Sequence, residues 1–209
     1  MNPQIVHYIE QEILPRYESY DAAHRRDHIE GVIERSLQLA AHYPELNRDM
    51  VYVVAAYHDL GLPEGRELHH ISSGRLLAED ERLAEWFTPD QVQTMREAIE
   101  DHRASASRPP RTLYGMIVAE ADRQIVPEVV MRRTVQYGLA HYPHLSREGH
   151  WERFVGHLHE KYDYGGYLTL YIPHSDNAQQ LETLRRLIAD KAKLRERFEE
   201  IFEKLRVES

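Results

Sequence analysis

The stretch that most constrains this chain is VYVVAAYHDLGL, residues 51–62. Asn47 is a suitable N-cap before it and Gly61 a suitable stop after it, so the pattern predicts a helix over about 48–60. The first half of the stretch is apolar at almost every position. A helix that is apolar on most of its circumference lies at the centre of a core, so the fold must be built around this segment.

The same stretch ends in two polar residues, His58 and Asp59. Burying a carboxylate and an imidazole together costs about several kcal/mol unless both have partners. A divalent metal ion is one partner that binds both groups, and it would lie at the partly negative C-terminal end of the helix. Two ligands are too few, so the chain should supply others from elsewhere.

Helical periodicity also dominates the rest of the chain, which predicts an all-α fold in a single domain over residues 1–209. Residues 162–176 are the longest irregular stretch, and LTLYI within it is a short strand candidate with no partner strand. Asp21 is the expected N-cap of the second helix. The other predicted helices are 3–18 (interrupted or ended near Pro15), 21–42, 69–86, 88–102, 111–126, 127–143, 147–162 and 177–207.

Composition narrows the classes of protein. A chain of 209 residues can bury a core without disulfides, and the lack of cysteine excludes disulfides and thiolate metal sites. We expect a cytoplasmic protein, because the lack of cysteine fits a reducing compartment. We expect no signal peptide, because the N-terminus has neither a basic lead nor an unbroken apolar region, and no membrane span, because no apolar run reaches about 18 residues. The net charge of −9 argues against duplex nucleic acid as a partner, but it leaves room for a local pocket that binds a small phosphorylated ligand.

Further candidate ligands lie in other predicted helices. His24 and His28 are four residues apart and therefore share a helix face, and His28 borders the apolar positions that follow it. Asp122 sits in VAEADR, inside another mostly apolar run. Like Asp59, Asp122 is an acid at a position where the pattern predicts burial.

Histidines also stand at two helix ends. His102 falls in the last turn of AIEDHR, and HHISSG offers His69 and His70 in a first turn. A lone histidine near an apolar face is more often an ordinary core residue than a ligand, and a single aspartate in a helix usually faces solvent. The joint pattern, with each residue on a different helix, favours a metal centre.

The order D-H-I-x-x-V, A-Y-H-D-L-G, H-x-x-x-S-G, E-D-H-R and A-E-A-D-R resembles the HD superfamily of metal-dependent phosphohydrolases, and most of all its small stand-alone bacterial members. The resemblance covers residues 20–125, and only loosely the helical extension over about 127–207. It implies a compact helical bundle with a metal-binding core and a C-terminal helical extension.

The resemblance implies that His28, His58, Asp59 and Asp122 are the primary metal ligands. Relatives with two metals add two histidines, and the H-x-x-x-S spacing selects His69 over the adjacent His70. The remaining histidine would be His102. We expect one or two divalent ions per chain, with one ion well occupied, and the metal is Mn, Fe, Co, Ni, Zn or Mg.

The implied activity is hydrolysis of a phosphate ester or anhydride in a small phosphorylated metabolite or nucleotide. Two alternatives stay open. The same six ligands hold two irons in family relatives that are oxygenases, and a non-catalytic module could bind metal or nucleotide with the same fold.

Several residues are weaker candidates. His24 and Arg103 are possible phosphate contacts, with a capping or surface role as the alternative. Lys161 and the tyrosines of its loop are candidates for a segment that covers the substrate; these tyrosines are Tyr162, Tyr164, Tyr167 and Tyr171. The charged C-terminal helix has an apolar face, which predicts core packing or a homodimer contact.

Overall fold

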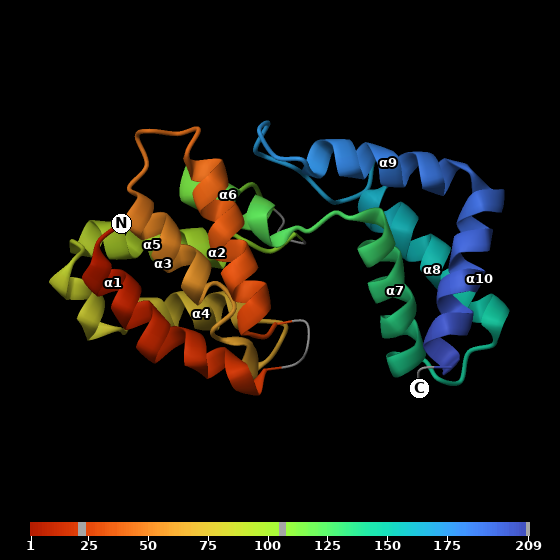
Figure 1. The fold of residues 1–209 in the computed structure, drawn as a ribbon, viewed down its shortest axis with the longest axis horizontal. Helices are drawn as coiled ribbons and strands as arrows, with labels where there is room; N and C mark the ends of the chain where they lie inside the picture. Colours follow the sequence, from red (N-terminus) through yellow and green to blue (C-terminus); the bar gives the residue numbers. More distant parts are fainter. Residues whose placement is uncertain (21–23, 105–107, 208–209) are drawn as a thin grey trace. The chain divides into compact units, whose positions relative to one another are not determined.

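The structure is a computed structural model that describes residues 1–20, 24–104 and 108–207. These residues form ten α-helices, and within them no strand occurs, so the predicted all-α fold is confirmed. Asp21, the expected N-cap, lies outside the described residues. In chain order (Figure 1) the α-helices are α1 Pro3–Tyr8, α2 Arg26–Ala40, α3 Arg48–Tyr57, α4 His69–Ala78, α5 Pro89–Glu100, α6 Leu113–Asp122, α7 Pro127–His141, α8 Arg147–Tyr162, α9 Asn177–Ala189 and α10 Lys191–Val207.

The chain divides into two compact units. The first unit contains residues 1–123 and 171–175, and the second contains residues 124–170 and 176–209. The prediction of one domain with a core over 20–125 and an extension over 127–207 stays a prediction. No helix among the described residues is long and apolar enough to cross a membrane.

Helix α3 is the centre of the first unit, as its sequence predicts. Every residue from Met50 to Tyr57 is buried, and α2, α5 and α6 pack around the helix. The Asn47 side chain caps its first turn by accepting hydrogen bonds from the backbone N–H groups of Asp49 and Met50. The helix ends at Tyr57 rather than near residue 60, so His58 and Asp59 lie in the turn that follows it.

Two predicted helices of the first unit are broken into shorter pieces. The segment 3–18 continues past α1 as a π-helix over Ile9–Ile13 and a 3₁₀-helix over Leu14–Ser19. Pro15 explains the change, because proline has no N–H to donate to the preceding turn. The segment 69–86 is divided at Asp80, whose side chain accepts from the Arg82 N–H and starts a separate 3₁₀-helix.

The second unit is formed by α7, α8, α9 and α10 around an aromatic core. Phe198 of α10 is fully buried and contacts Trp151, Phe154 and Phe202, with ring centroids 5.3–5.4 Å apart. The single helix predicted over 177–207 is wrong. Asp190 separates α9 from α10, because its carboxylate accepts a hydrogen bond from the Lys193 N–H and so caps a new helix.

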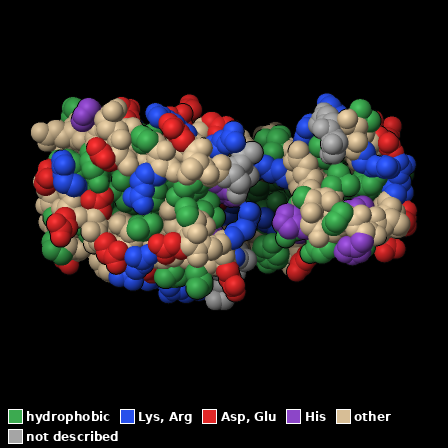
Figure 2. Space-filling model, turned by 90° about the horizontal axis from the view of Figure 1, so that it is seen from below, with side chains coloured by type: hydrophobic (Ala, Val, Ile, Leu, Met, Phe, Trp, Pro, Cys, Tyr) green, Lys and Arg blue, Asp and Glu red, His purple; other side chains and the backbone are tan. Residues whose placement is uncertain are grey.

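The apolar face of α10 packs within its own unit, through Leu194, Phe198, Phe202 and Leu205. The homodimer contact stays a prediction. On the face drawn in Figure 2, Asp and Glu side chains are interspersed with Lys and Arg side chains. That face therefore offers mixed charge rather than a continuous basic stripe.

Candidate metal centre

The turn after α3 presents His58 and Asp59 from the centre of the first unit. The His58 Nδ1 atom lies 2.7 Å from the Ala55 carbonyl oxygen, and because a carbonyl only accepts, Nδ1 carries the hydrogen. Two tyrosines hold the same turn by donating to backbone carbonyls, Tyr17 to Ala56 at 2.8 Å and Tyr20 to Leu60 at 2.7 Å. The turn is therefore fixed by groups that satisfy the carbonyls at the helix end.

Four of the predicted ligands converge beside this turn, and we call them the first cluster: His28, His58, Asp59 and Asp122. The His28 Nε2 atom lies 3.2 Å from Asp122 Oδ1 and 3.9 Å from Asp59 Oδ2. The His58 Nε2 atom lies 3.3 Å from Asp59 Oδ2 and 3.8 Å from Asp122 Oδ1. Arg35 of α2 fixes the end of α6 next to Asp122 by donating to the Ala121 carbonyl at 2.7 Å.

The other two predicted histidines meet the opposite oxygen of the same carboxylate. We call Asp59, His69 and His102 the second cluster. Asp59 Oδ1 lies 3.3 Å from His69 Nε2 and 3.6 Å from His102 Nε2, and the two Nε2 atoms are 3.2 Å apart. Asp59 thus has one oxygen in each cluster, which is the arrangement needed to bridge two ions.

A close contact between α3 and α4 sets the position of His69 relative to Asp59. The Gly61 N–H donates to the buried Ser73 Oγ at 2.8 Å. A Cβ atom on Gly61 would lie 2.5 Å from the Ser73 nitrogen and 2.7 Å from the His69 carbonyl oxygen. Gly61 has a φ of −84°, so glycine is needed here for close approach and not for a left-handed conformation.

The donor set of both clusters fits a divalent cation. The Nδ1 atoms of His69 and His102 lie 2.8 Å and 2.6 Å from the carbonyls of Arg66 and Ile99 and therefore carry hydrogens, as in His58. In the neutral form of each ring, Nε2 would present a lone pair toward the carboxylate oxygens of Asp59, as a metal ligand does. Among the described residues, neither His28 Nε2 nor His58 Nε2 has a hydrogen-bond partner. Acceptors that face acceptors require a proton or a metal ion between them.

The pKa shifts in the first cluster also indicate that its two carboxylates favour a positive charge beside them. Burial by itself lowers the pKa of His58, but the charges of Asp59 and Asp122 outweigh it and raise that pKa to about 9. Burial raises the pKa of Asp59, but His58 and hydrogen bonds from His102 and His69 hold it well below its usual range. The pKa of Asp122 is also lowered, because His28 and the charge of His58 outweigh its burial.

His70 belongs to neither cluster, although it is adjacent to His69. Burial and the nearby charges of His102, Arg103 and His69 lower the pKa of His70 to about 4. The weaker candidates lie at the edge of the site. The His24 ring is 6.0 Å from that of His28, and Arg103 Nη1 donates to the Glu67 carbonyl at 2.5 Å.

The tyrosine loop is divided between the two units. Tyr164 donates to Glu182 of α9 in the second unit, and the Tyr171 N–H donates to the buried Glu120 of α6 in the first. The covering role of these tyrosines and of Lys161 stays a prediction.

Some residues that shape the site escaped the sequence analysis. Tyr17, Tyr20 and Arg35 act through backbone carbonyls, and such contacts leave no spacing pattern in a sequence. Asp101 is only 4% exposed and directly precedes His102, so an acid and a histidine are adjacent here as they are at His58 and Asp59. That adjacency is the signal that the sequence offers for Asp101.

Comparison with known proteins agrees with this geometry. The HD domain family profile matches residues 25–124, a range that includes all six residues of the two clusters. The chain carries an HD domain. The first cluster comes from three separate parts of this HD domain, which are α2, the turn after α3 and the end of α6. The first residue of α4 and the turn after α5 supply the histidines of the second cluster.

A crystal structure of a predicted HD superfamily hydrolase from an uncultured Thermotogales bacterium is similar to this chain. The two share 21% sequence identity with a TM-score of 0.49, over 74% of this chain and 86% of the other. A comparison with curated proteins found no match.

Proposed function

We propose that this chain is a metal-dependent phosphohydrolase that cleaves a phosphate ester or anhydride of a small phosphorylated metabolite or nucleotide. The observation that carries the proposal is a set of imidazole and carboxylate groups from six residues, which form two clusters that share the carboxylate of Asp59. The HD domain supports it at the level of the family.

In this proposal, His28, His58, Asp59 and Asp122 hold one ion, and Asp59, His69 and His102 hold a second. A bound divalent ion polarises a phosphoryl oxygen and lowers the pKa of coordinated water. The carbonyls of Ala55, Arg66 and Ile99 keep the three Nδ1 hydrogens in place, so each Nε2 faces the site. This preorganisation fixes the ligand rings before any ion or substrate arrives.

With one ion bound, His69 and His102 would have a different task. Their Nε2 atoms lie 3.2 Å apart beside Asp59 Oδ1, so the pair can hold a proton there. A protonated Nε2 can donate a hydrogen bond to a phosphoryl oxygen or pass its proton to a leaving group. His24 and Arg103 remain candidates for contacts with the substrate.

The test begins with elemental analysis of protein purified without chelator. Release of phosphate is then measured with the metal found, across nucleotides, dinucleoside polyphosphates, cyclic nucleotides and sugar phosphates. Oxygen uptake is followed with the iron-loaded protein. Phosphate release supports the proposal. Two irons with oxygen uptake would replace it with an oxygenase, and bound metal with neither activity would indicate a binding module.

His69 and His70 form a matched pair for the second cluster. We expect His69→Ala to lower phosphate release at least about tenfold more than His70→Ala, since only His69 lies next to Asp59 Oδ1. The measurement is kcat for both variants at saturating metal. A larger loss in His70→Ala would show that the register of the second cluster is wrong.

A further inference from the structure

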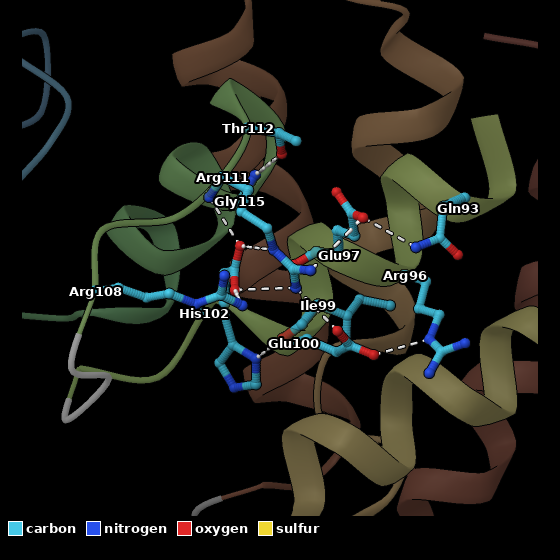
Figure 3. A network of polar contacts seen from close by, with 11 residues as sticks. Gln93, Arg96, Glu97, Ile99, Glu100, His102, Arg108, Arg111, Thr112 and Gly115 are labelled. Atoms are coloured by element: carbon cyan, nitrogen blue, oxygen red, sulfur yellow. Dashed lines mark hydrogen bonds and ion pairs between the residues drawn. The ribbon is translucent and has the colours of Figure 1, made fainter. Parts of the chain in front are cut away.

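A network of charged side chains lies behind His102 (Figure 3). Asp101 is buried, and its Oδ2 accepts from the Arg111 backbone N–H and from Arg111 Nε, both at 2.8 Å. Arg111 Nη2 donates to the other oxygen at 3.1 Å, and Arg108 contacts the same oxygen at 3.3 Å. The Asp101 carboxylate is therefore engaged by arginine and is not part of either cluster.

Arg111 also joins the other acids at the end of α5. Its Nη2 donates to Glu100 Oε2 at 2.9 Å and to the Glu97 carbonyl at 3.3 Å, and its Nη1 lies 3.6 Å from Glu97 Oε1. Three acids thus crowd the C-terminal turn of a helix, where the helix dipole disfavours negative charge. The Arg111 guanidinium contacts all three acids, and its pKa is raised by its hydrogen bonds to Asp101 and Glu100, although burial opposes this.

Arg111 contacts the C-terminal turn of α5, and this turn also orients the His102 ring. Ile99, whose carbonyl fixes the Nδ1 hydrogen of His102, belongs to the same turn. Arg111 directly precedes Thr112, which caps the start of α6 by accepting from the Gly115 N–H. The network therefore ties the helix end that carries His102 to the helix that carries Asp122.

We propose that Arg111, acting through Asp101, is a positioning residue for His102 and thereby sets the affinity of the second cluster for a divalent ion. The affinity part rests on the proposed function, whereas the aim of the His102 ring does not. Arg96 supplies the matched control, because it pairs with the other oxygen of Glu100 at 2.8 Å and does not contact Asp101.

The first experiment uses full-length, metal-free protein and ¹H–¹⁵N correlation of the histidine rings, at a pH where His102 is neutral. We expect wild type and Arg96→Gln to hold His102 as the Nδ1–H tautomer, and Arg111→Gln to show a mixture of tautomers. Asp101→Asn is a second variant in case Arg111→Gln does not fold. An unchanged His102 signal in the folded variants would overturn the proposal.

The second experiment titrates the same proteins with Mn²⁺ and follows both binding steps by calorimetry. We expect Arg111→Gln to weaken one step about 10–100-fold, the range for groups that orient metal ligands, and to leave the other step unchanged. Arg111→Lys should bind Mn²⁺ at that step almost as weakly as Arg111→Gln, because lysine lacks the planar guanidinium that donates several hydrogen bonds at once. Equal weakening of both steps would reduce Arg111 to a general structural role and overturn the proposal. If wild type binds no Mn²⁺ while the His102 ring is released in Arg111→Gln, the positioning role stands and the proposed function fails.

Discussion

The two units are both helical, but they bury different kinds of side chain. The first unit buries a set of polar and charged residues: Ser36, His58, Asp59, Ser73, Asp101, His102 and Glu120. The second unit buries Thr134 and His150 among its polar residues and fills its core with aromatic and aliphatic side chains. The buried polar side chains are thus concentrated in the first unit, which holds the candidate metal centre, and are few in the second.

Acids of the second unit lie in ion pairs at its surface. Arg195 pairs with Glu148 at 2.8 Å and with Glu199 at 2.7 Å, and these side chains are all exposed to solvent by about a third or more. Exposed pairs of this kind contribute roughly 0–1 kcal/mol each. In the first unit, Asp59 is buried with imidazoles instead, a costly arrangement that a bound cation would offset.

The largest expected effect is on activity and comes from Asp59→Ala. Removing the carboxylate shared by both clusters should lower phosphate release about 10³-fold or more, because a metal site supplies several kcal/mol of transition-state stabilisation. Bound metal should fall in parallel, as measured by elemental analysis. Glu148→Gln, at an exposed acid of the second unit, is the control and should keep both. Full activity in Asp59→Ala would show that the metal mechanism is wrong.

The second prediction concerns the packing core. Phe198→Ala should lower the free energy of unfolding by about 3–5 kcal/mol, because it removes a fully buried aromatic ring and leaves a cavity. Trp151 lies 5.4 Å from this ring, so its fluorescence should report the transition in a urea titration. Metal content of the folded variant should be that of wild type. Loss of metal at full folding would contradict the separation of roles between the units.

Ser73→Ala should have a smaller effect, and it should lower both the free energy of unfolding and the affinity for metal. It leaves the Gly61 N–H without its hydrogen-bond partner and should cost about 1–3 kcal/mol in the free energy of unfolding. Because Ser73 joins the turn after Asp59 to α4, metal affinity should fall with it. The neighbouring Ser72→Ala is the matched control for urea unfolding and metal titration. Equal costs for the two variants would remove Ser73 from the positioning of His69.

The smallest expected effect is a pH dependence of stability above pH 10. Burial, and then the hydrogen bond that Tyr8 donates to Asp80, raise the pKa of Tyr8 from 10.0 to about 12. The folded protein therefore keeps this proton where the unfolded chain has lost it. The stability that Tyr8 contributes is fully present below pH 10 and is lost as pH rises through 12.

In Tyr8→Phe, the free energy of unfolding in urea should decrease less between pH 9 and pH 11 than it does in wild type. Tyr164, a 70% exposed tyrosine of the second unit, is the control, and Tyr164→Phe should change the slope less. An equal change in both variants would mean that burial of the Tyr8 phenol does not set the pH dependence.

The sequence pattern predicts the helices of this chain better than it predicts where each helix ends. The centre of α3 follows from its run of apolar residues, and the cap at Asn47 follows from residue type. The break at Asp190 was missed, because the apolar positions on both sides of it continue a helical spacing and only the carboxylate cap ends the first helix. The sequence predicts Gly61 as a helix stop, whereas in the structure it allows close contact with α4, and a pattern within the preceding helix does not reveal that contact.

The sequence by itself determined the helical class, the central position of α3 and the residue types of a metal centre, since these follow from periodicity and from the cost of burying His58 and Asp59. Only the tertiary structure decided that Asp59 turns one oxygen to each cluster and that Arg111 holds the turn behind His102. The reason is physical: spacing along a helix fixes which face a side chain occupies, but which atoms meet depends on the packing of helices from distant parts of the chain.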